Sequence, residues 1–535
     1  MSNFGVINWT ILIVYVVGNL LLGFVLSKRI HTAQDYFLGR RTTPWWAIGI
    51  SVVATYISAL TFLGGPAWAY SEGFSVILIH INYPIAISIV ITVFLPFFYK
   101  SGVASIFDYL ERRFGLPART VMSGVFLFGN VAYSGIMLYT TALVLEFITG
   151  IDVVNSILIV AVVALTYTML GGIMAVIWTD VIQTVILFLG AIITVALLIG
   201  GLPESLSGTL QTLQAQGKTD PFEYSFDPSK VATIWTGIIA MSIYHVTVYG
   251  VNQMMVQRTL AAKTIGDAKK AYILLAYVAI FIYILFFGMG LLFNSYYGGR
   301  EFENGNLIVM EFVATMGFPG LMGVITAAIV AAAMSSLDSS LNSMATVTTL
   351  DFYQKFFRKK GSDGHFLVAS RWFTVLWAIV MIVPAIIYTR SDGSVLELLS
   401  KMGSFFVGAK LSMFGLGFFS KHATERGVLI GVVAGFISLF YVEFYADVAW
   451  PWYCAIGAIV STAVGWTASV LIDGWQDQYS LYTVKGQFSK YRREQLPMKQ
   501  DKWYVVPGRI DRASWWLLAY FVLFVLSLGL VERLI

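Results

Sequence analysis

Long apolar runs separated by short polar segments dominate the hydropathy pattern of this 535-residue chain. A run of about 20 apolar residues can cross a bilayer as a helix. Strands of a membrane barrel would instead alternate apolar and polar residues, and these runs are continuous. The pattern predicts an all-α polytopic membrane protein with about 14 transmembrane helices. The runs begin near Ile7, Trp46, Phe74, Val121, Val153, Ala175, Val231, Tyr272, Gly320, Trp372, Ser404, Val428, Pro451 and Trp515.

Composition excludes a soluble fold. Hydrophobic residues make up 58% of the chain and charged residues 12%, against about 25% charged residues in a soluble protein. The segment before the first run carries no Lys or Arg, so we expect that run to be a permanent span rather than a signal peptide. Cys454 is the single cysteine, which excludes an intrachain disulfide. The chain has no Gly-rich phosphate loop and no H-E-x-x-H, so the motifs do not favour an enzyme.

Lysine and arginine residues gather in alternate loops. Cytoplasmic loops of membrane proteins carry the excess of these residues, so the asymmetry places the odd-numbered loops in the cytoplasm and both termini outside. We therefore expect a multi-pass protein of the plasma (inner) membrane. The net charge of +5 does not indicate a nucleic-acid partner. The cytoplasmic clusters include Lys28, Arg29, Arg40, Arg41, Lys100, Arg112, Arg113, Arg119, Arg258, Lys263, Lys269, Lys270, Lys355, Arg358, Lys359 and Lys360.

Two polar loops are longer than the others. One runs from about Pro203 to Lys230 and is predicted to lie outside, and the other covers 473–513 and is predicted to be cytoplasmic. Neither is long enough to form a separate domain. We therefore expect a single transmembrane domain over 1–535, with the last helix at 514–533.

Three ionisable residues fall inside the predicted spans: Asp180, Asp338 and Lys410. Such groups are costly in a bilayer and are functional candidates for that reason. Lys410 lies too deep to reach the membrane surface easily. It would either bind an anionic solute or pair with Asp338 or Asp180.

The segment 327–343 is rich in small and hydroxyl-bearing residues. Ser335, Asp338, Ser339 and Asn342 recur at helical spacing and share one face. An oxygen-rich stripe suits a hard cation such as Na⁺. Hydroxyls that only join neighbouring helices are the alternative, but that role rarely needs a buried carboxylate.

Two spans carry helix-breaking residues. Gly64, Gly65 and Pro66 interrupt the second run, and Tyr249 to Gln253 place a glycine beside polar groups in the seventh. Interrupted helices at corresponding places in two halves indicate an inverted-repeat transporter with its site between them. His80 would line that site or bond a neighbouring helix, and His245 is a weaker candidate.

Five motifs connect the chain to a known family. They are Asp35-Tyr-Phe-Leu-Gly39 with Pro44-Trp-Trp46, and the segments Phe107 to Phe114, Gly171 to Gln183, Asn252 to Lys263 and Ser335 to Tyr353. In their order and spacing the chain resembles the sodium/solute symporters over roughly residues 7–440. That family includes sodium-coupled glucose, proline, iodide and multivitamin carriers.

The resemblance implies a fold and a sodium site. The fold is a LeuT-like 5+5 inverted-repeat core, here 46–200 and 231–442. The family's sodium site would take the backbone carbonyls of Ala54, Ile57 and Ala332 and the hydroxyls of Ser335 and Ser336. A second sodium site, present in some members, would correspond to Asp180, Ser335, Asp338 and Ser339. Asp338 stands where two-sodium members have a hydroxyl, so this second site stays open: stronger, protonated, or tied to Lys410.

The resemblance also indicates where the solute binds. The matching or neighbouring polar positions are Ser58, Thr61, His80, Tyr133, Asn252 and Lys410. Sugar carriers have Gln, Glu, Asn and Lys where this chain has Thr61, His80, Tyr133 and Ala279, and a sialic-acid carrier has Arg near Tyr133. Neither pattern is met. Similarity to the iodide, vitamin and monocarboxylate carriers, together with Lys410, favours an anion.

We therefore predict a sodium-coupled importer of a small organic or anionic solute that works by alternating access. The expected partners are Na⁺, the solute and the lipid bilayer, and the oligomeric state is left open. A sodium-dependent channel or sensor, a sugar-specific symporter and an integral-membrane enzyme are the alternatives. No appended signalling domain is recognised in the sequence, which weighs against the sensor.

Overall fold

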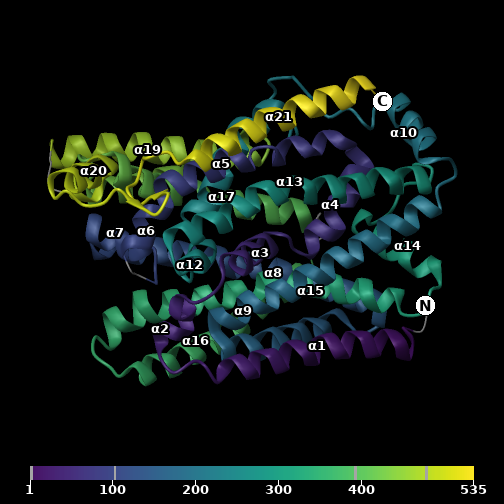
Figure 1. Cartoon of the computed structure of the whole chain (residues 1–535), viewed down its shortest axis with the longest axis horizontal. Coiled ribbons are helices and arrows are strands. Elements are labelled where there is room, and N and C mark those ends of the chain that lie inside the picture. The colour runs from purple at the N-terminus through teal and green to yellow at the C-terminus, as the bar shows by residue number, and fades with distance from the viewer. Residues whose placement is uncertain (1–3, 102–103, 391–394, 476–479, 535) are drawn as a thin grey trace.

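The computed structural model describes residues 4–101, 104–390, 395–475 and 480–534. These residues are almost wholly helical, and the long helices run roughly along the long axis of the molecule (Figure 1). Within them, ten helical segments are long and apolar enough to cross a membrane, which confirms a polytopic helical membrane protein. The segments are Gly5–Ser27, Phe74–Lys100, Leu116–Thr149, Val153–Gly200, Ile265–Tyr296, Leu321–Phe357, Asp363–Tyr388, Glu425–Tyr445, Pro451–Asp473 and Arg512–Leu530.

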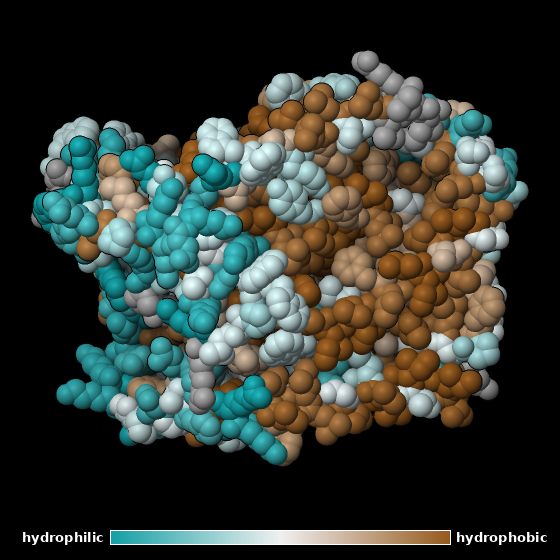
Figure 2. All heavy atoms as spheres, in the orientation of Figure 1, coloured by the Kyte–Doolittle hydropathy of each residue, from teal (hydrophilic) through white to brown (hydrophobic). Residues whose placement is uncertain are grey.

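The bundle has two unlike ends. The start of α1 (Gly5–Ser27), the end of α21 (Arg512–Leu534), α10 (Leu206–Ala215) and α14 (Ile308–Met316) gather at one end (Figure 1). The other end carries α2 (Ala33–Leu38), α7 (Phe107–Arg113) and α20 (Val484–Arg493). Figure 2 shows a broad hydrophobic surface over the bundle and a hydrophilic surface at the α20 end. This division is expected of a protein whose middle lies in lipid.

Helix α15 (Leu321–Val347) is the centre of the bundle. Almost all its residues are buried, and it packs against α1, α8 (Leu116–Thr149) and α9 (Val153–Gly200). It continues into a wider helical turn, η6 (Thr348–Phe357). Its small side chains allow these neighbours to approach closely.

The fifth and sixth apolar runs form one bent element, α9, with its bend at Gly172. This glycine has φ 51° and ψ −153°, in the left-handed region that other residues rarely adopt. A Cβ atom there would also lie 2.7 Å from the carbonyl oxygen of Tyr36. The bend and its close contact with α2 therefore both require glycine.

The second apolar run is broken, but not where the sequence predicted. Helix α3 (Trp45–Tyr56) ends at Tyr56, Ile57 and Ser58 are extended, and α4 (Ala59–Glu72) follows. Gly64, Gly65 and Pro66 lie inside α4, so the predicted position was wrong. At Pro66 the helix packs closely against α13 (Ile265–Tyr296). A Cβ on Gly290 of α13 would lie 2.3 Å from the Pro66 carbonyl oxygen.

The predicted break in the seventh run is confirmed. Helix α11 (Met241–Gly250) ends at Gly250, and α12 (Gln253–Leu260) begins after Val251 and Asn252. The Asn252 side chain accepts a hydrogen bond from the Met254 amide at 3.1 Å. It therefore caps α12, because it satisfies an amide that the helix itself leaves without a partner.

The remaining elements complete the two ends. The described part of the outer loop holds α10, and that of the 473–513 loop holds η7 (Ser480–Tyr482), α20 and the short pair β1 (Lys499–Gln500) and β2 (Trp503–Tyr504). The other long helices are α16 (Asp363–Tyr388), α17 (Val395–Phe419), α18 (Glu425–Tyr445) and α19 (Pro451–Asp473). The segment 74–101 combines η2 (Phe74–His80), α5 (Tyr83–Ile89), η3 (Val90–Phe94) and α6 (Leu95–Ser101).

Candidate functional site

A small cavity lies where α3 ends between α9 and α15. Its volume is about 10 Å³, which suits one water-sized particle. Ala54 and Ile57 from the broken run line one side, and Ala332 and Ser335 from α15 line another. Four of the five residues expected around the sodium ion therefore surround a single space.

The fifth expected residue, Ser336, ties α15 to the broken run. Its hydroxyl donates to the Thr55 carbonyl at 3.1 Å. The last four carbonyls of a helix have no partner within it, so ending α3 at Tyr56 makes backbone oxygens available beside α15. The break in the chain thus creates acceptors where the small cavity lies.

Gln183 of α9 also lines this cavity. Its amide nitrogen donates to the Tyr15 hydroxyl at 3.2 Å. Its Oε1 is buried and has no hydrogen-bond donor among the described residues. A buried acceptor without a donor is costly, and a cation in the cavity would satisfy it. The residues present therefore fit Na⁺, and sequence reasoning missed Gln183 because it examined the motif and not the cavity wall.

Asp180 lies one helical turn from Gln183 and is fully buried. Its carboxylate accepts from the Ser51 hydroxyl at 2.5 Å and from the Ser335 hydroxyl at 2.5 Å. Ser335 thus touches both the small cavity and Asp180. The carboxylate can therefore orient a hydroxyl of the candidate sodium site.

A guanidinium occupies the centre of the predicted second sodium site. Arg258 of α12 lies 3.5 Å from Asp180 Oδ2 and also donates to the hydroxyls of Ser51 and Ser339. Its side chain is 1% exposed. The sequence had counted Arg258 among the cations of a cytoplasmic loop, and its burial in α12 corrects that placement.

Asp338 is hydrogen-bonded by hydroxyls and makes no direct ion pair among the described residues. Its carboxylate accepts from Tyr167 at 3.0 Å, from Thr179 at 3.4 Å and from Ser339 at 3.1 Å. These donors come from both halves of α9 and from α15 itself. Asp338 is fully buried, so the site holds two carboxylates around one guanidinium.

Lys410 is separate from both carboxylates. It is 7% exposed on α17, and its Nζ lies 5.5 Å from the centre of the Phe126 ring of α8. Among the described residues it makes no ion pair, so the structure does not show the pairing with Asp338 or Asp180 that was one of the two alternatives for Lys410. The geometry is that of a cation facing an aromatic ring.

His80 lies in a cluster of aromatic side chains. Its ring stacks on Tyr283 of α13 with ring centres 3.4 Å apart, and it lies 6.1 Å from the ring of His245. Its Nδ1 is buried without a hydrogen-bond partner among the described residues. The cluster is completed by Tyr83 and Tyr249, and sequence reasoning missed its tyrosines because tyrosine is common in membrane spans.

The other predicted solute residues lie at the two breaks and on α8. Ser58 is buried at the start of α4, and Thr61 is half-buried one turn further on. Tyr133 of α8 is half-buried beside Ser336 and Tyr244. Asn252 is half-buried and caps α12, so its side chain has a structural partner.

A second polar network, which the sequence did not predict, closes the α7 end of the bundle. Arg119 donates to Asp351 of η6 at 2.9 Å and lies 3.2 Å from Asp108 and 2.5 Å from Glu111. Asp351 also accepts from the hydroxyls of Ser105 at 2.7 Å and Ser123 at 2.9 Å. The network joins α7, α8 and η6.

Glu111 shows how strongly this network favours charged carboxylates. Partial burial alone would raise its pKa, but hydrogen bonds from Lys355 and Arg119 lower the pKa below the usual value. Lys355 Nζ lies 2.8 Å from Glu111 Oε2. Ion pairs therefore help to hold the α7 end, beside the apolar contacts of the buried Phe107 and Leu110.

Comparisons with known proteins agree with this geometry. A profile of the sodium:solute symporter family matches residues 36–435. A sodium/sialic acid symporter of Proteus mirabilis is 31% identical over 479 residues, which cover 87% of this chain and 95% of that protein. A sodium/glucose cotransporter of Vibrio parahaemolyticus is 30% identical over 444 residues, which cover 77% of this chain and 80% of that protein.

A solved structure also resembles this chain over most of its length. The substrate-bound, outward-open structure of a Na⁺-coupled sialic acid symporter superimposes with a TM-score of 0.80 at 30% identity. The alignment covers 88% of this chain and 99% of that one.

Proposed function

Because the chain belongs to the sodium:solute symporter family, we propose that Na⁺ binds in the cavity between α3, α9 and α15 and drives solute import by alternating access. The protein is a sodium-coupled symporter for a small organic solute, and Na⁺ is its coupling ion. It is a multi-pass protein of the plasma membrane. The observation that carries the proposal is the meeting of four expected ligand residues at one small cavity.

The proposed ligands are the carbonyls of Ala54, Ile57 and Ala332 and the hydroxyls of Ser335 and Ser336. Oxygen donors of this kind suit a hard cation. The ligands come from α15 and from the break after α3, so an ion between them would hold the two elements together. The membrane potential adds about 2.3 kcal/mol per charge per 100 mV to its inward movement.

For the second sodium site we propose that Arg258 supplies the positive charge in this conformation. Its contacts with Asp180 and Ser339 support this assignment. A second Na⁺ at Asp180, Asp338 and Ser339 would have to displace the guanidinium.

We further propose fourteen spans, with a LeuT-like core of two inverted repeats at 46–200 and 231–442 and both termini outside. The breaks at Ile57–Ser58 and at Val251–Asn252 each interrupt the first span of a proposed repeat, which supports this arrangement. The start of α1 and the end of α21 lie at one end of the bundle (Figure 1).

The solute would bind between the two breaks, beside Ser58, Thr61 and Tyr133, with His80 in the aromatic wall. Relatives of this chain carry sialic acid or glucose, but the position matched to their charged or amide-bearing residues holds Tyr133 here. The unpartnered Nδ1 of His80 supports a solute that offers it a hydrogen bond. Lys410 of α17, whose Nζ lies 5.5 Å from the Phe126 ring of α8, supports an organic anion rather than a cation.

The proposal is tested by uptake into proteoliposomes with and without a Na⁺ gradient. Candidate solutes are first selected by thermal shift, because a true substrate stabilises the protein more when Na⁺ is present. Ser335→Ala with Ser336→Ala should abolish Na⁺-dependent accumulation. Ser340→Ala is the matched control, because this hydroxyl of the same helix points to the Met254 sulfur at 3.4 Å. Accumulation that persists without a Na⁺ gradient, or in the double variant, would overturn the proposal.

A further inference from the structure

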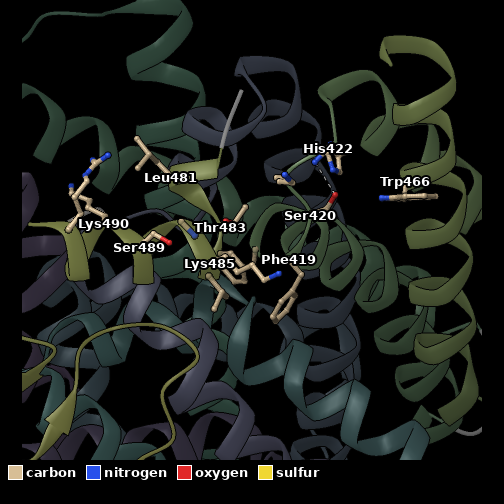
Figure 3. Close-up of a pocket in the computed structure, with 14 residues that line it drawn as sticks. Phe419, Ser420, His422, Trp466, Leu481, Thr483, Lys485, Ser489 and Lys490 are labelled. Carbon is tan, nitrogen blue, oxygen red and sulfur yellow. Dashed lines mark hydrogen bonds between the residues drawn. The ribbon is translucent and has the colours of Figure 1, made fainter. Parts of the chain in front are cut away.

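A large pocket lies at the α20 end of the bundle, outside the sodium and solute region. Its volume is about 710 Å³. One wall is the end of α17 and the residues after it, and the other is α20 (Figure 3). Trp466 of α19 stands at its edge. A pocket of this size can hold a ligand of several tens of atoms.

The pocket is strongly basic. Its lining includes Lys421, Lys485, Lys490 and Arg493, together with His422. None of its fourteen lining residues is an aspartate or glutamate. Lys100 adds positive charge beside Lys490. Cations gathered in this way attract an anion, and phosphate oxygens are the acceptors that Lys and Arg bind well.

Exposed aromatic side chains lie at the pocket, and Trp475 lies beside it next to His422 and Trp466. Phe419 is 66% exposed, Trp466 is 40% exposed and Trp475 is 69% exposed. The Trp475 ring lies 4.4 Å from that of His422 and 6.2 Å from that of Trp466. Tryptophan is enriched where the membrane meets water. Exposed tryptophans at and beside the pocket therefore favour a position at the level of the lipid headgroups.

We propose that this pocket binds the headgroup of an anionic phospholipid. Lys485, Lys490 and Arg493 of α20 contact the phosphate, and the acyl chains lie along Phe419 and Trp466. A free phosphate ion would use the cations alone and leave the exposed aromatic wall without a partner. The wall therefore favours a lipid, because basic pockets beside spans on the cytoplasmic side suit such headgroups.

The ligand would also join separate parts of the chain. Helix α20 belongs to the long loop after α19, whereas Ser420 and Lys421 follow α17. The backbone carbonyl of Ser420 accepts from Arg113 of α7 at 2.7 Å. A headgroup held between α20 and the end of α17 would thus fasten the loop to the α7 end of the bundle.

The test compares lipid retention by the full-length protein in detergent, counted by native mass spectrometry. Phosphatidylglycerol and phosphatidylcholine are supplied in equal amounts. The wild type should retain phosphatidylglycerol preferentially. The variant Lys485→Gln/Lys490→Gln/Arg493→Gln should lose that preference by at least about fivefold, since each Lys or Arg near a lipid surface adds to its attraction for anionic lipid.

The control variant Arg358→Gln/Lys360→Gln/Lys502→Gln removes the same number of exposed cations elsewhere. It should keep the preference, and both variants should keep the wild-type unfolding midpoint. If the pocket variant does not fold, Lys485→Gln alone replaces it, because this side chain is exposed. Equal loss in the control, or no preference in the wild type, would overturn the proposal. So would inorganic phosphate that raises the unfolding midpoint as much as phosphatidylglycerol does.

Discussion

Asp338 and Asp351 lie on one continuous helical segment, Leu321–Phe357, and both are fully buried. Asp351 pairs directly with Arg119 and accepts from two serines. Among the described residues, Asp338 accepts only from hydroxyl groups, and the Arg258 guanidinium bonds to Asp180 and Ser339 instead.

Asp351 thus belongs to a closed ion-pair network, whereas Asp338 lies in a region that can accept a further charged group. A buried pair with a permanent cation is strongly destabilised when one partner is removed. A carboxylate bound by hydroxyls has partners that can rotate and bond to another group. Buried aspartates on one helix can therefore have different roles, and their partners decide which.

The largest effect is expected from Arg119→Met. The change leaves Asp351 buried without its cation, which costs about 3–5 kcal/mol. The thermal unfolding midpoint in detergent, followed by tryptophan fluorescence, should fall by several degrees. Arg112→Met is the control, because Arg112 is 47% exposed and bonds only at the surface of the network. Equal midpoints for the two variants would mean that Asp351 does not belong to a closed ion-pair network. Its contrast with Asp338 would then disappear.

Asp180→Asn should weaken Na⁺ coupling. Asp180 orients Ser335, a proposed sodium ligand, and carries the charge that faces Arg258. A hydrogen bond to a charged group contributes about 1.5–3 kcal/mol, so the Na⁺ concentration for half-maximal uptake should rise by about tenfold. An unchanged Na⁺ dependence of uptake would show that Asp180 does not act on the sodium site.

Asp338→Asn should have a smaller effect. The amide oxygen can still accept from Tyr167 and Thr179, so stability should fall by less than about 1.5 kcal/mol. With Arg258 in the second site, the ratio of ²²Na⁺ flux to solute flux should stay the same. A ratio that falls by one ion per solute would contradict this, because it would place a second Na⁺ at Asp338.

The smallest effect on stability is expected from Glu223→Gln. This variant serves as a reference for ion pairs at the surface. Hydrogen bonds from Lys230 and Ser225 lower the pKa of Glu223 to about 2, and Lys230 Nζ lies 2.9 Å away at the surface. A lowered pKa stabilises the fold above about pH 4, and the contribution is lost as the pH falls toward 2. Since solvent screens exposed pairs, the variant should cost less than about 1 kcal/mol. Its unfolding midpoint should differ from wild type at pH 7 and converge with it near pH 2.

The sequence predicted most of the helices and part of the site. Uninterrupted apolar runs predict spans because every backbone group in lipid must bond within its own helix. The hydroxyl stripe of α15 was visible from its spacing, and so was the break before Asn252. The break at Ile57–Ser58 was not, because neither residue is a helix breaker and the nearby glycines and proline were a stronger but misleading signal.

The sequence could not show which arginines are buried in the bundle and which lie in loops. Arg258 follows the second break and precedes Lys263, so its position along the chain is that of a loop residue. Its partner Asp180 is 78 residues away, and only the folded bundle brings them together. Arg119 was likewise counted with loop charges, although its side chain is 4% exposed.

The buried pairing of Arg258 has a consequence for how the protein is made. An unpaired arginine within a span is costly when that span enters lipid through the translocon, by up to about 2.5–3.5 kcal/mol at the helix centre. Asp180 precedes Arg258 in the chain, so its carboxylate is already in the bilayer when α12 emerges from the ribosome. Insertion of the seventh span is then assisted by a helix synthesised earlier, and the order of synthesis becomes part of what makes this polar core feasible.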